Sequence, residues 1–181
     1  MYLTNPRLIR TVKDTASPEE IAVFHEQYRQ KSRDNARTPM QWDATPNAGF
    51  SSSSTTPWMR VHPNHSTINA AAQTADANSV FHCWRAVLAA RKRLVDVFVY
   101  GGFELLGAAD DDQVFAYERT SAEGERVVVV CNFSTEAVAW GGMPGGGVRE
   151  VVLSTVGKTA EDFKTGSVQL APYEAAAVLL C

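Results

Sequence analysis

Residues 32–43 read SRDNARTPMQWD, a stretch in which cationic, carboxylate, amide and aromatic side chains follow one another closely. Arg33 and Arg37 each present a planar fork of N–H donors, and Asp34 and Asn35 can hold such a fork or a pair of hydroxyl groups. The proline of this stretch disfavours helical backbone at the residue before it, so we expect an irregular loop that displays polar groups. Residue types alone leave open a salt-bridged loop that only braces a domain.

A helix is predicted immediately before this loop, over residues 18–31. Ser17 is a suitable N-cap, Pro18 fits the first helical position, and a glutamate follows at the third. The apolar residues of the helix repeat on one face, and they are Ile21, Phe24 and Tyr28. Residues 1–16 show little periodicity and are expected to form a loose lead-in.

Residues 44–77 are predicted to form a long ordered loop without regular elements. Serine, threonine, proline and glycine are frequent there and apolar residues are few. We expect three aromatic residues to pin the loop, namely Trp42, Phe50 and Trp58. His62 and His65 are three positions apart, but no further ligand stands at a familiar metal-site spacing, so we expect them to cap and pack the loop.

A second helix is predicted over residues 78–94, with Asp76 or Asn78 as its cap. Its apolar stripe is broad and consists of Val80, Phe81, Trp84, Val87, Leu88 and Leu94. Three basic residues, 91–93, stand near its C-terminus, where they complement the helix dipole. His82 and Cys83 are expected to serve packing rather than chemistry.

The period changes to that of strands after residue 94. Seven short strands are predicted, over residues 97–106, 113–119, 126–133, 137–140, 148–153, 167–170 and 173–180. Turn signals separate them, and an aspartate run at residues 110–112 is read as a solvated turn rather than a calcium site. Strands this close together without intervening helices predict an antiparallel sandwich or barrel. Residues 127–130 are all valine, as expected of a central strand that is covered on both faces.

Composition excludes several classes of function. The 181 residues are 45% hydrophobic and 20% charged, as in an ordinary globular protein, and the net charge of −3 leaves no basic footprint for nucleic acid. No apolar run is long enough to cross a membrane, and the N-terminus lacks a signal-peptide pattern. The three cysteines, at 83, 131 and 181, are read as buried or free thiols in a reducing compartment, so we expect a cytoplasmic location.

The loop sequence resembles a segment found late in the α-glucosidases (maltases and isomaltases) of glycoside hydrolase family 13, in particular those of fungal type. The similarity continues through NAGF at 47–50, PW at 57–58, VHPNH at 61–65 and IN at 68–69. Where this chain has VHPNH, the family usually has VNPNY, so this chain departs from the family at His62 and His65. LAPYEA at 170–175 resembles the end of the family's β-domain, and the similarity extends from about Pro18 to the C-terminus.

The resemblance implies an α+β fragment of a larger fold. Residues 1–77 would be a loop-rich excursion from a (β/α)8 barrel, residues 78–95 the last barrel helix, and residues 96–181 a C-terminal antiparallel β-sandwich domain. The barrel-facing side of the helix would then be an exposed apolar patch through which the chain self-associates.

The resemblance also implies hydrolysis of terminal α-glucosidic bonds in oligosaccharides, with an α-linked gluco-oligosaccharide as the substrate. It implies that Arg33 binds the non-reducing-end glucose, and that Asp34, Asn35 and Arg37 position the loop. Retaining glycosidases need two carboxyl groups about 5–5.5 Å apart, and the family carries them on barrel strands that have no counterpart here. No catalytic residue, metal or cofactor is therefore predicted in this chain, which is expected to have little activity by itself.

Two other functions stay open on the sequence. One is a free-standing carbohydrate-binding β-domain, which would show exposed aromatic residues in a row on one sheet, with Phe133 and Trp140 as candidates. The other is a non-catalytic interaction protein that binds a partner through the exposed helix patch.

Overall fold

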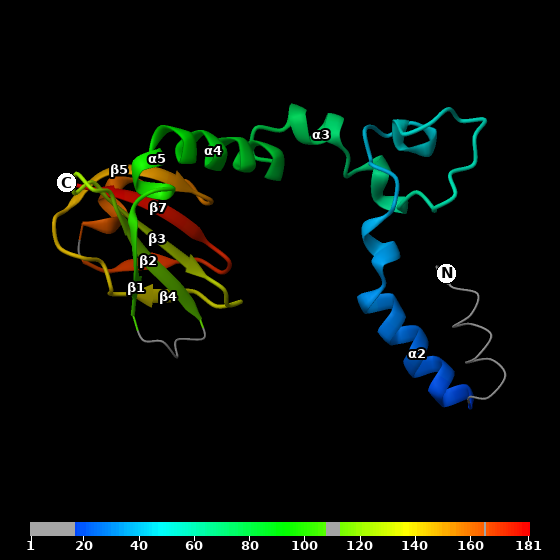
Figure 1. The fold of residues 1–181 in the computed structure, drawn as a ribbon, viewed down its shortest axis with the longest axis horizontal. Helices are drawn as coiled ribbons and strands as arrows, with labels where there is room; N and C mark the ends of the chain where they lie inside the picture. Colours follow the sequence, from blue (N-terminus) through cyan, green and yellow to red (C-terminus); the bar gives the residue numbers. More distant parts are fainter. Residues whose placement is uncertain (1–16, 108–112, 165) are drawn as a thin grey trace. The chain divides into compact units, whose positions relative to one another are not determined.

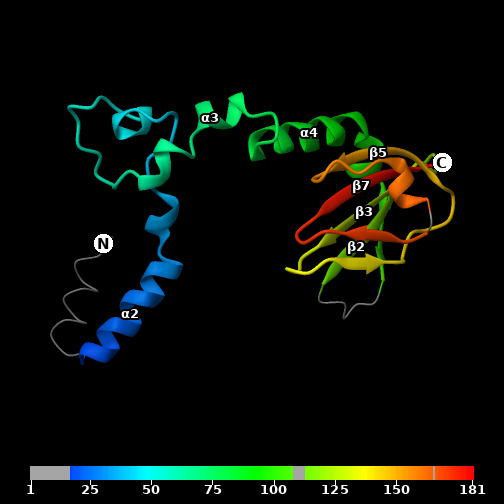
Figure 2. The same cartoon turned by 180° about the vertical axis from the view of Figure 1, so that it is seen from behind.

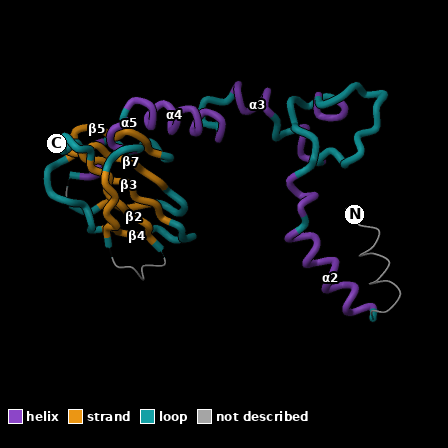
Figure 3. Tube along the Cα trace, viewed as in Figure 1, coloured by secondary structure: helices purple, strands orange, loops and turns teal. Residues whose placement is uncertain are grey.

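The computed structural model describes residues 17–107, 113–164 and 166–181 (Figure 1). The chain divides into two compact units, Met1–Ala77 and Asn78–Cys181. Helices and loops make up the described part of the first unit, and the strands all lie in the second (Figure 3). The predictions made for residues 1–16 and for the aspartate run at 110–112 fall outside the described residues.

The described part of the first unit starts at the predicted helix, α2, which spans Pro18–Lys31. Its capping box is complete, because the Ser17 N–H donates to Glu20 Oε2 at 2.8 Å and the Glu20 N–H donates to Ser17 Oγ at 3.2 Å. Extended backbone at Ser32 ends the helix, and the Ser32 N–H donates to the Tyr28 carbonyl at 2.9 Å. The chain therefore leaves α2 at the start of the SRDNARTPMQWD stretch.

The rest of the first unit contains more regular structure than the sequence predicted. Short 3₁₀ helices span Arg33–Ala36, Pro46–Gly49 and Pro63–Ser66, and a helix, α3, spans Ala70–Ala75. The prediction of a loop without regular elements was wrong for α3, whose alanine-rich sequence favours helix and whose cap is Asn69. Asn69 Oδ1 accepts from the Ala72 N–H at 2.9 Å, which satisfies one of the free donors of the first turn.

Amide side chains hold this loop together. Asn47 Nδ2 donates to the carbonyls of Ser52 and Thr55, both at 2.7 Å, and Gln41 Nε2 donates to Asn64 Oδ1 at 3.0 Å. We expected aromatic pins, and that expectation was wrong, because Trp42, Phe50 and Trp58 expose 53%, 53% and 76% of their surface. A loop with few apolar residues has no core in which such rings can be buried, so polar side chains take over the task of fixing the backbone.

The two histidines serve the loop as predicted. His62 is the N-cap of the Pro63–Ser66 turn, where its Nδ1 accepts from the Asn64 N–H at 3.3 Å. His65 Nδ1 lies 3.1 Å from the His62 carbonyl oxygen. In the part of the chain that the structure describes, no three His, Cys, Asp or Glu side chains come together as a metal site.

The second unit contains the seven predicted strands in two sheets. They are β1 Gly102–Leu106, β2 Val114–Thr120, β3 Arg126–Asn132, β4 Val138–Trp140, β5 Val148–Ser154, β6 Val168–Leu170 and β7 Ala175–Leu180. Five strands form an antiparallel sheet in the order β1-β2-β3-β7-β5, and β4 pairs with β6 in a small second sheet. Figure 2 shows β2, β3, β7 and β5 side by side.

Both faces of the five-stranded sheet carry buried side chains, although the helices cover only part of the second face. Val128, Val130 and Val178 point to the face that packs against β4, β6 and a 3₁₀ turn at Ala160–Phe163. Val127 and Leu179 point to the opposite face, beneath the helices. The alternation of side chains along a strand requires an apolar residue at every position when both faces are buried, which explains the valine run at 127–130.

Helices α4, Val80–Arg93, and α5, Val95–Phe98, lie over that second face (Figure 1). Ser79 caps α4 by accepting from the His82 N–H at 3.4 Å, so neither cap named from the sequence was right. The strand predicted from residue 97 starts at Gly102 instead, because the preceding residues form α5. β-branched residues favour a strand there, but a helical turn buries Leu94 and Val97 on the sheet, and this packing overrides the local preference.

None of the described helices is both long enough and apolar enough to cross a membrane. The three cysteines form no disulfide, since Cys83, Cys131 and Cys181 are all free.

The turn from α5 into β1 gives a stability prediction. A methyl group at Gly101 would overlap the Val97 carbonyl oxygen and would lie 2.7 Å from the Thr120 carbonyl oxygen, whereas at Gly102 the nearest atom is 3.8 Å away. Gly101→Ala should therefore lower the free energy of unfolding by about 1–3 kcal/mol, and Gly102→Ala, the matched control, by clearly less. Urea unfolding followed by circular dichroism measures both, and equal losses would contradict this account of the turn.

Candidate functional site

The SRDNARTPMQWD stretch begins with a tight turn directly after α2. The turn is the 3₁₀ helix Arg33–Ala36, with Ser32 as its N-cap. Ser32 Oγ accepts from the Asp34 N–H at 3.2 Å, and the Arg37 N–H donates to the Asp34 carbonyl at 3.1 Å. Serine suits this position because its short side chain can reach the backbone two residues ahead.

Two neighbours of Arg33 anchor the turn. Asp34 is buried, with 5% of its surface exposed. Asn35 Nδ2 donates to the Arg29 carbonyl at 2.7 Å, and so ties the turn to the last residues of α2. A carbonyl near a helix C-terminus lacks an intrahelical partner, and the amide supplies one.

The side chain of Arg33 takes no part in these contacts. Its side chain is exposed and forms no hydrogen bond or ion pair with any residue that the structure describes. A guanidinium on a fixed backbone whose N–H groups are not taken up by the described residues is suited to binding hydroxyl groups or a carboxylate. The structure thus places the residue singled out for binding at an accessible position on an anchored turn.

Arg37 lies in a different environment. Its backbone N–H closes the turn, but its side chain lines a hollow of about 340 Å³. Phe50 and Trp58 contribute aromatic rings to this hollow, and hydroxyl groups come from Thr38, Ser51, Thr55 and Thr56. The sequence did not reveal the hollow, although aromatic and hydroxyl residues are mixed at positions 50–58.

Two carboxylates of this unit, on Glu20 and Asp43, make local hydrogen bonds. Glu20 completes the capping box of α2. Asp43 Oδ1 accepts from the Thr45 N–H at 2.8 Å and also from the Thr45 hydroxyl, and these bonds hold the pKa of Asp43 below its ordinary value. A general acid needs a raised pKa to be protonated near neutral pH, so Asp43 is unsuited to that role.

The aromatic row expected of a carbohydrate-binding β-domain is not formed by its two candidates. Trp140 is buried in the core between the two sheets, with 6% of its surface exposed, whereas Phe133 is 65% exposed. The two side chains therefore cannot form one exposed platform. Trp140 is buried because β4 belongs to the small sheet that closes the sandwich.

Comparison with protein families gives two matches that together span nearly the whole chain. Residues 3–101 match the family described as the alpha amylase catalytic domain. Residues 104–178 match a family described as a domain of unknown function, DUF3459.

Curated relatives include bacterial and fungal enzymes. The oligo-1,6-glucosidase of Parageobacillus thermoglucosidasius is 44% identical over 117 residues, which is 65% of this chain and 19% of that enzyme. The alpha-glucosidase of Schizosaccharomyces pombe is 35% identical over 161 residues, or 88% of this chain and 27% of that enzyme. The chain thus spans well under a third of the length of these relatives.

Solved structures also match most of this chain and less than a third of their own length. The isomaltulose synthase of Erwinia rhapontici NX5, as its D241A mutant in complex with D-glucose, matches with a TM-score of 0.80 and 34% identity over 93% of this chain and 29% of that one. The trehalulose synthase MutB of Pseudomonas mesoacidophila MX-45 matches with a TM-score of 0.74 and 32% identity over 83% of this chain and 26% of its own.

The anchored turn yields a prediction for Asn35. Asn35→Ala removes the donor to the Arg29 carbonyl, and Asn35→Asp adds a negative charge beside the negative end of the α2 dipole. We expect amide hydrogen exchange at the α2–turn junction to become faster in the order Asn, Ala, Asp, with the first step worth about 1 kcal/mol. If the aspartate variant is as protected as the parent chain, the amide bond does not anchor the turn.

Proposed function

The chain belongs to the alpha-amylase family, and on that basis we propose that it is the C-terminal part of an α-glucosidase of the maltase or isomaltase type. The reaction would be hydrolysis of terminal α-glucosidic bonds in gluco-oligosaccharides. The observation that carries the proposal is the accessible Arg33 guanidinium on a turn anchored by Asp34 and Asn35. The α-glucosidase and oligo-1,6-glucosidase relatives support it, and similar identities to fungal and bacterial enzymes, 35% and 34%, leave the fungal type without specific support.

In this proposal the chain is divided into three functional parts. Residues 1–77 form an excursion that presents Arg33, residues 78–95 form the last helix of the barrel, and residues 96–181 form the C-terminal β-domain. The division of the chain into compact units at residues 77 and 78 supports the first boundary. Free thiols at all three cysteines support a cytoplasmic location.

Arg33 would bind rather than react. A planar guanidinium fork can donate to two adjacent sugar hydroxyls, or can hold a carboxylate that accepts from them. Asp34 and Asn35 would fix the backbone that carries the fork, and Arg37 would contribute through its backbone to the turn and through its side chain to the neighbouring hollow. The nucleophile and the general acid would come from the part of the catalytic domain that this chain lacks.

The exposed face of α4 supports an additional role as an interaction surface. Val80, Trp84 and Leu88 expose 67%, 61% and 57% of their surface on one side of the helix, and Phe81 exposes 41% beside them. A contiguous apolar face of this kind marks a contact with other protein. We infer that the rest of a barrel packs there, and that copies of the chain self-associate through this face when it is left bare.

The isolated chain should not hydrolyse maltose, isomaltose or an aryl α-glucoside, because in this proposal the two carboxyl groups that the reaction needs lie outside this chain. The measurement is release of glucose or of the aryl leaving group by the purified chain against buffer. Turnover faster than in buffer alone that persists in the Glu19→Gln, Glu20→Gln and Asp34→Asn variants would show that other residues of the chain catalyse the reaction. That result would overturn the proposal that the chain is an inactive part of a larger enzyme.

In a full-length α-glucosidase that carries this segment, Arg33→Ala should lower kcat/KM roughly tenfold to a few hundredfold, because charge-assisted hydrogen bonds to the bound sugar are lost. The melting temperature should change little, since the guanidinium has no partner to leave unpaired among the described residues. Arg29→Ala is the matched control, because Arg29 is an exposed arginine that pairs with Glu26 at 2.9 Å on α2. A large loss of stability in Arg33→Ala, or equal kinetic effects in both variants, would refute the role assigned to Arg33.

A further inference from the structure

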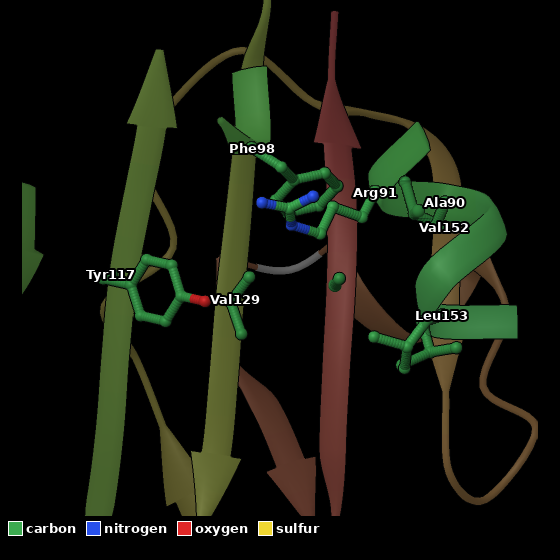
Figure 4. Close-up of a pocket in the computed structure, with 9 residues that line it drawn as sticks. Ala90, Arg91, Phe98, Tyr117, Val129, Val152 and Leu153 are labelled. Atoms are coloured by element: carbon green, nitrogen blue, oxygen red, sulfur yellow. The ribbon is translucent and has the colours of Figure 1, made fainter. Parts of the chain in front are cut away.

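A hollow of about 290 Å³ lies in the second unit, between α4, α5 and the five-stranded sheet (Figure 4). All the residues that line it belong to the second unit, and Val87 and Arg91 on α4 are among them. We propose that this hollow binds a small organic carboxylate with an apolar body, such as an aryl-alkanoate. The proposal rests on the shape and lining of the hollow and does not depend on the glucosidase assignment.

The walls select an apolar body. Valine, leucine and alanine side chains form most of the lining, and they include Val87, Val129, Val152, Leu153 and Ala177. A cavity of about 150 Å³ accommodates a benzene ring, so a hollow of about 290 Å³ has room for a ring with a short side chain. A sugar would fit poorly, because most of its hydroxyl groups would lie against carbon with no hydrogen-bond partner.

The charge beside the hollow selects an anion. Arg91 extends from α4 toward the side of the sheet where Tyr117 lies (Figure 4). Its side chain forms no ion pair or hydrogen bond within the part of the chain that the structure describes, whereas Arg93, two residues further along α4, pairs with Glu150 at 2.6 Å. A second cation lies close by, since Arg119 donates to the carbonyls of Val97 and Phe98, both at 3.3 Å.

Tyr117 gives the site a second polar group in a fixed position. Its ring stacks on Phe103 with centroids 5.2 Å apart and meets Phe115 with centroids 5.6 Å apart. These contacts hold the ring on the sheet with its hydroxyl directed toward Val129 at the hollow (Figure 4). A tyrosine hydroxyl is protonated at neutral pH and can donate to a carboxylate, and burial raises the pKa of Tyr117 further above its ordinary value.

The test uses 3-phenylpropanoate and its neutral amide, 3-phenylpropanamide, as matched probes with the 181-residue chain. Methyl NMR spectra report binding at the valine and leucine residues of the hollow. We expect saturable shifts with both probes, and about tenfold tighter binding of the carboxylate, because only the anion gains charge-assisted hydrogen bonds from Arg91. Binding that does not saturate, or equal affinity for the two probes, would overturn the proposal.

Paired variants on α4 distinguish binding in the hollow from nonspecific attraction of an anion to the basic end of the helix. Arg91→Gln should reduce carboxylate affinity to that of the amide, whereas Arg93→Gln, which removes the arginine paired with Glu150, should leave the preference intact. Ala90→Leu should block both probes by filling the hollow, and Ala89→Leu, an exposed neighbour outside the lining, should not.

Equal effects of Arg91→Gln and Arg93→Gln, or unchanged binding in Ala90→Leu, would refute a site at this hollow. If the chain forms a dimer that Ala90→Leu dissociates, a second copy occupies the hollow and the small-ligand proposal fails. Circular dichroism melting curves that match the parent chain show that each variant is folded.

Discussion

The burial of β3 and β7 on both faces is the constraint on which the second unit depends. Val128 and Val178 pack toward β4 and β6, and Val127 and Leu179 pack toward the helices. A strand with apolar side chains on both sides cannot face water on either, so the sheet needs two covering layers. The small sheet with its 3₁₀ turn supplies one layer, and α4 with α5 supplies the other. Because α4 and α5 are the last helices within the alpha-amylase match, this second layer packs that part of the chain against the β-domain.

The helical layer is narrower than the sheet that it covers. Leu94 and Val97 bury the part of the sheet around Val127 and Leu179, while Phe103 and Phe115 on β1 and β2 remain 58% and 44% exposed. The hollow beside Arg91 lies on the same face, where α4 stands over Val129, Val152 and Ala177. Incomplete cover of an otherwise two-sided sheet thus leaves an apolar recess, and Arg91 lies at its edge without an ion pair to any described residue.

The first unit is stabilised by a different kind of interaction. Few of its side chains are buried, and amides of Asn47, Asn35 and Gln41 bind backbone carbonyls in place of a hydrophobic core. Each such bond contributes only about 1 kcal/mol, yet together they fix irregular backbone that helix and sheet ladders cannot reach. The same arrangement leaves aromatic rings and arginines accessible, which is the property that a ligand-binding loop requires.

The sequence by itself determined the secondary structure of most of the chain and the identity of the binding candidate. Capping residues placed α2, and alternating and continuous apolar patterns placed the seven strands. The family resemblance of the SRDNARTPMQWD stretch singled out Arg33 as a candidate. The sequence did not reveal α5, where β-branched residues favour a strand, nor the burial of Trp140, nor the exposure of Trp42 and Trp58. These features depend on which surface each segment meets after folding, and local patterns carry no information about the contacts made between distant segments. Only the tertiary structure could place Arg91 beside an apolar hollow, because the walls of that hollow come from α4 and from strands far apart in the chain.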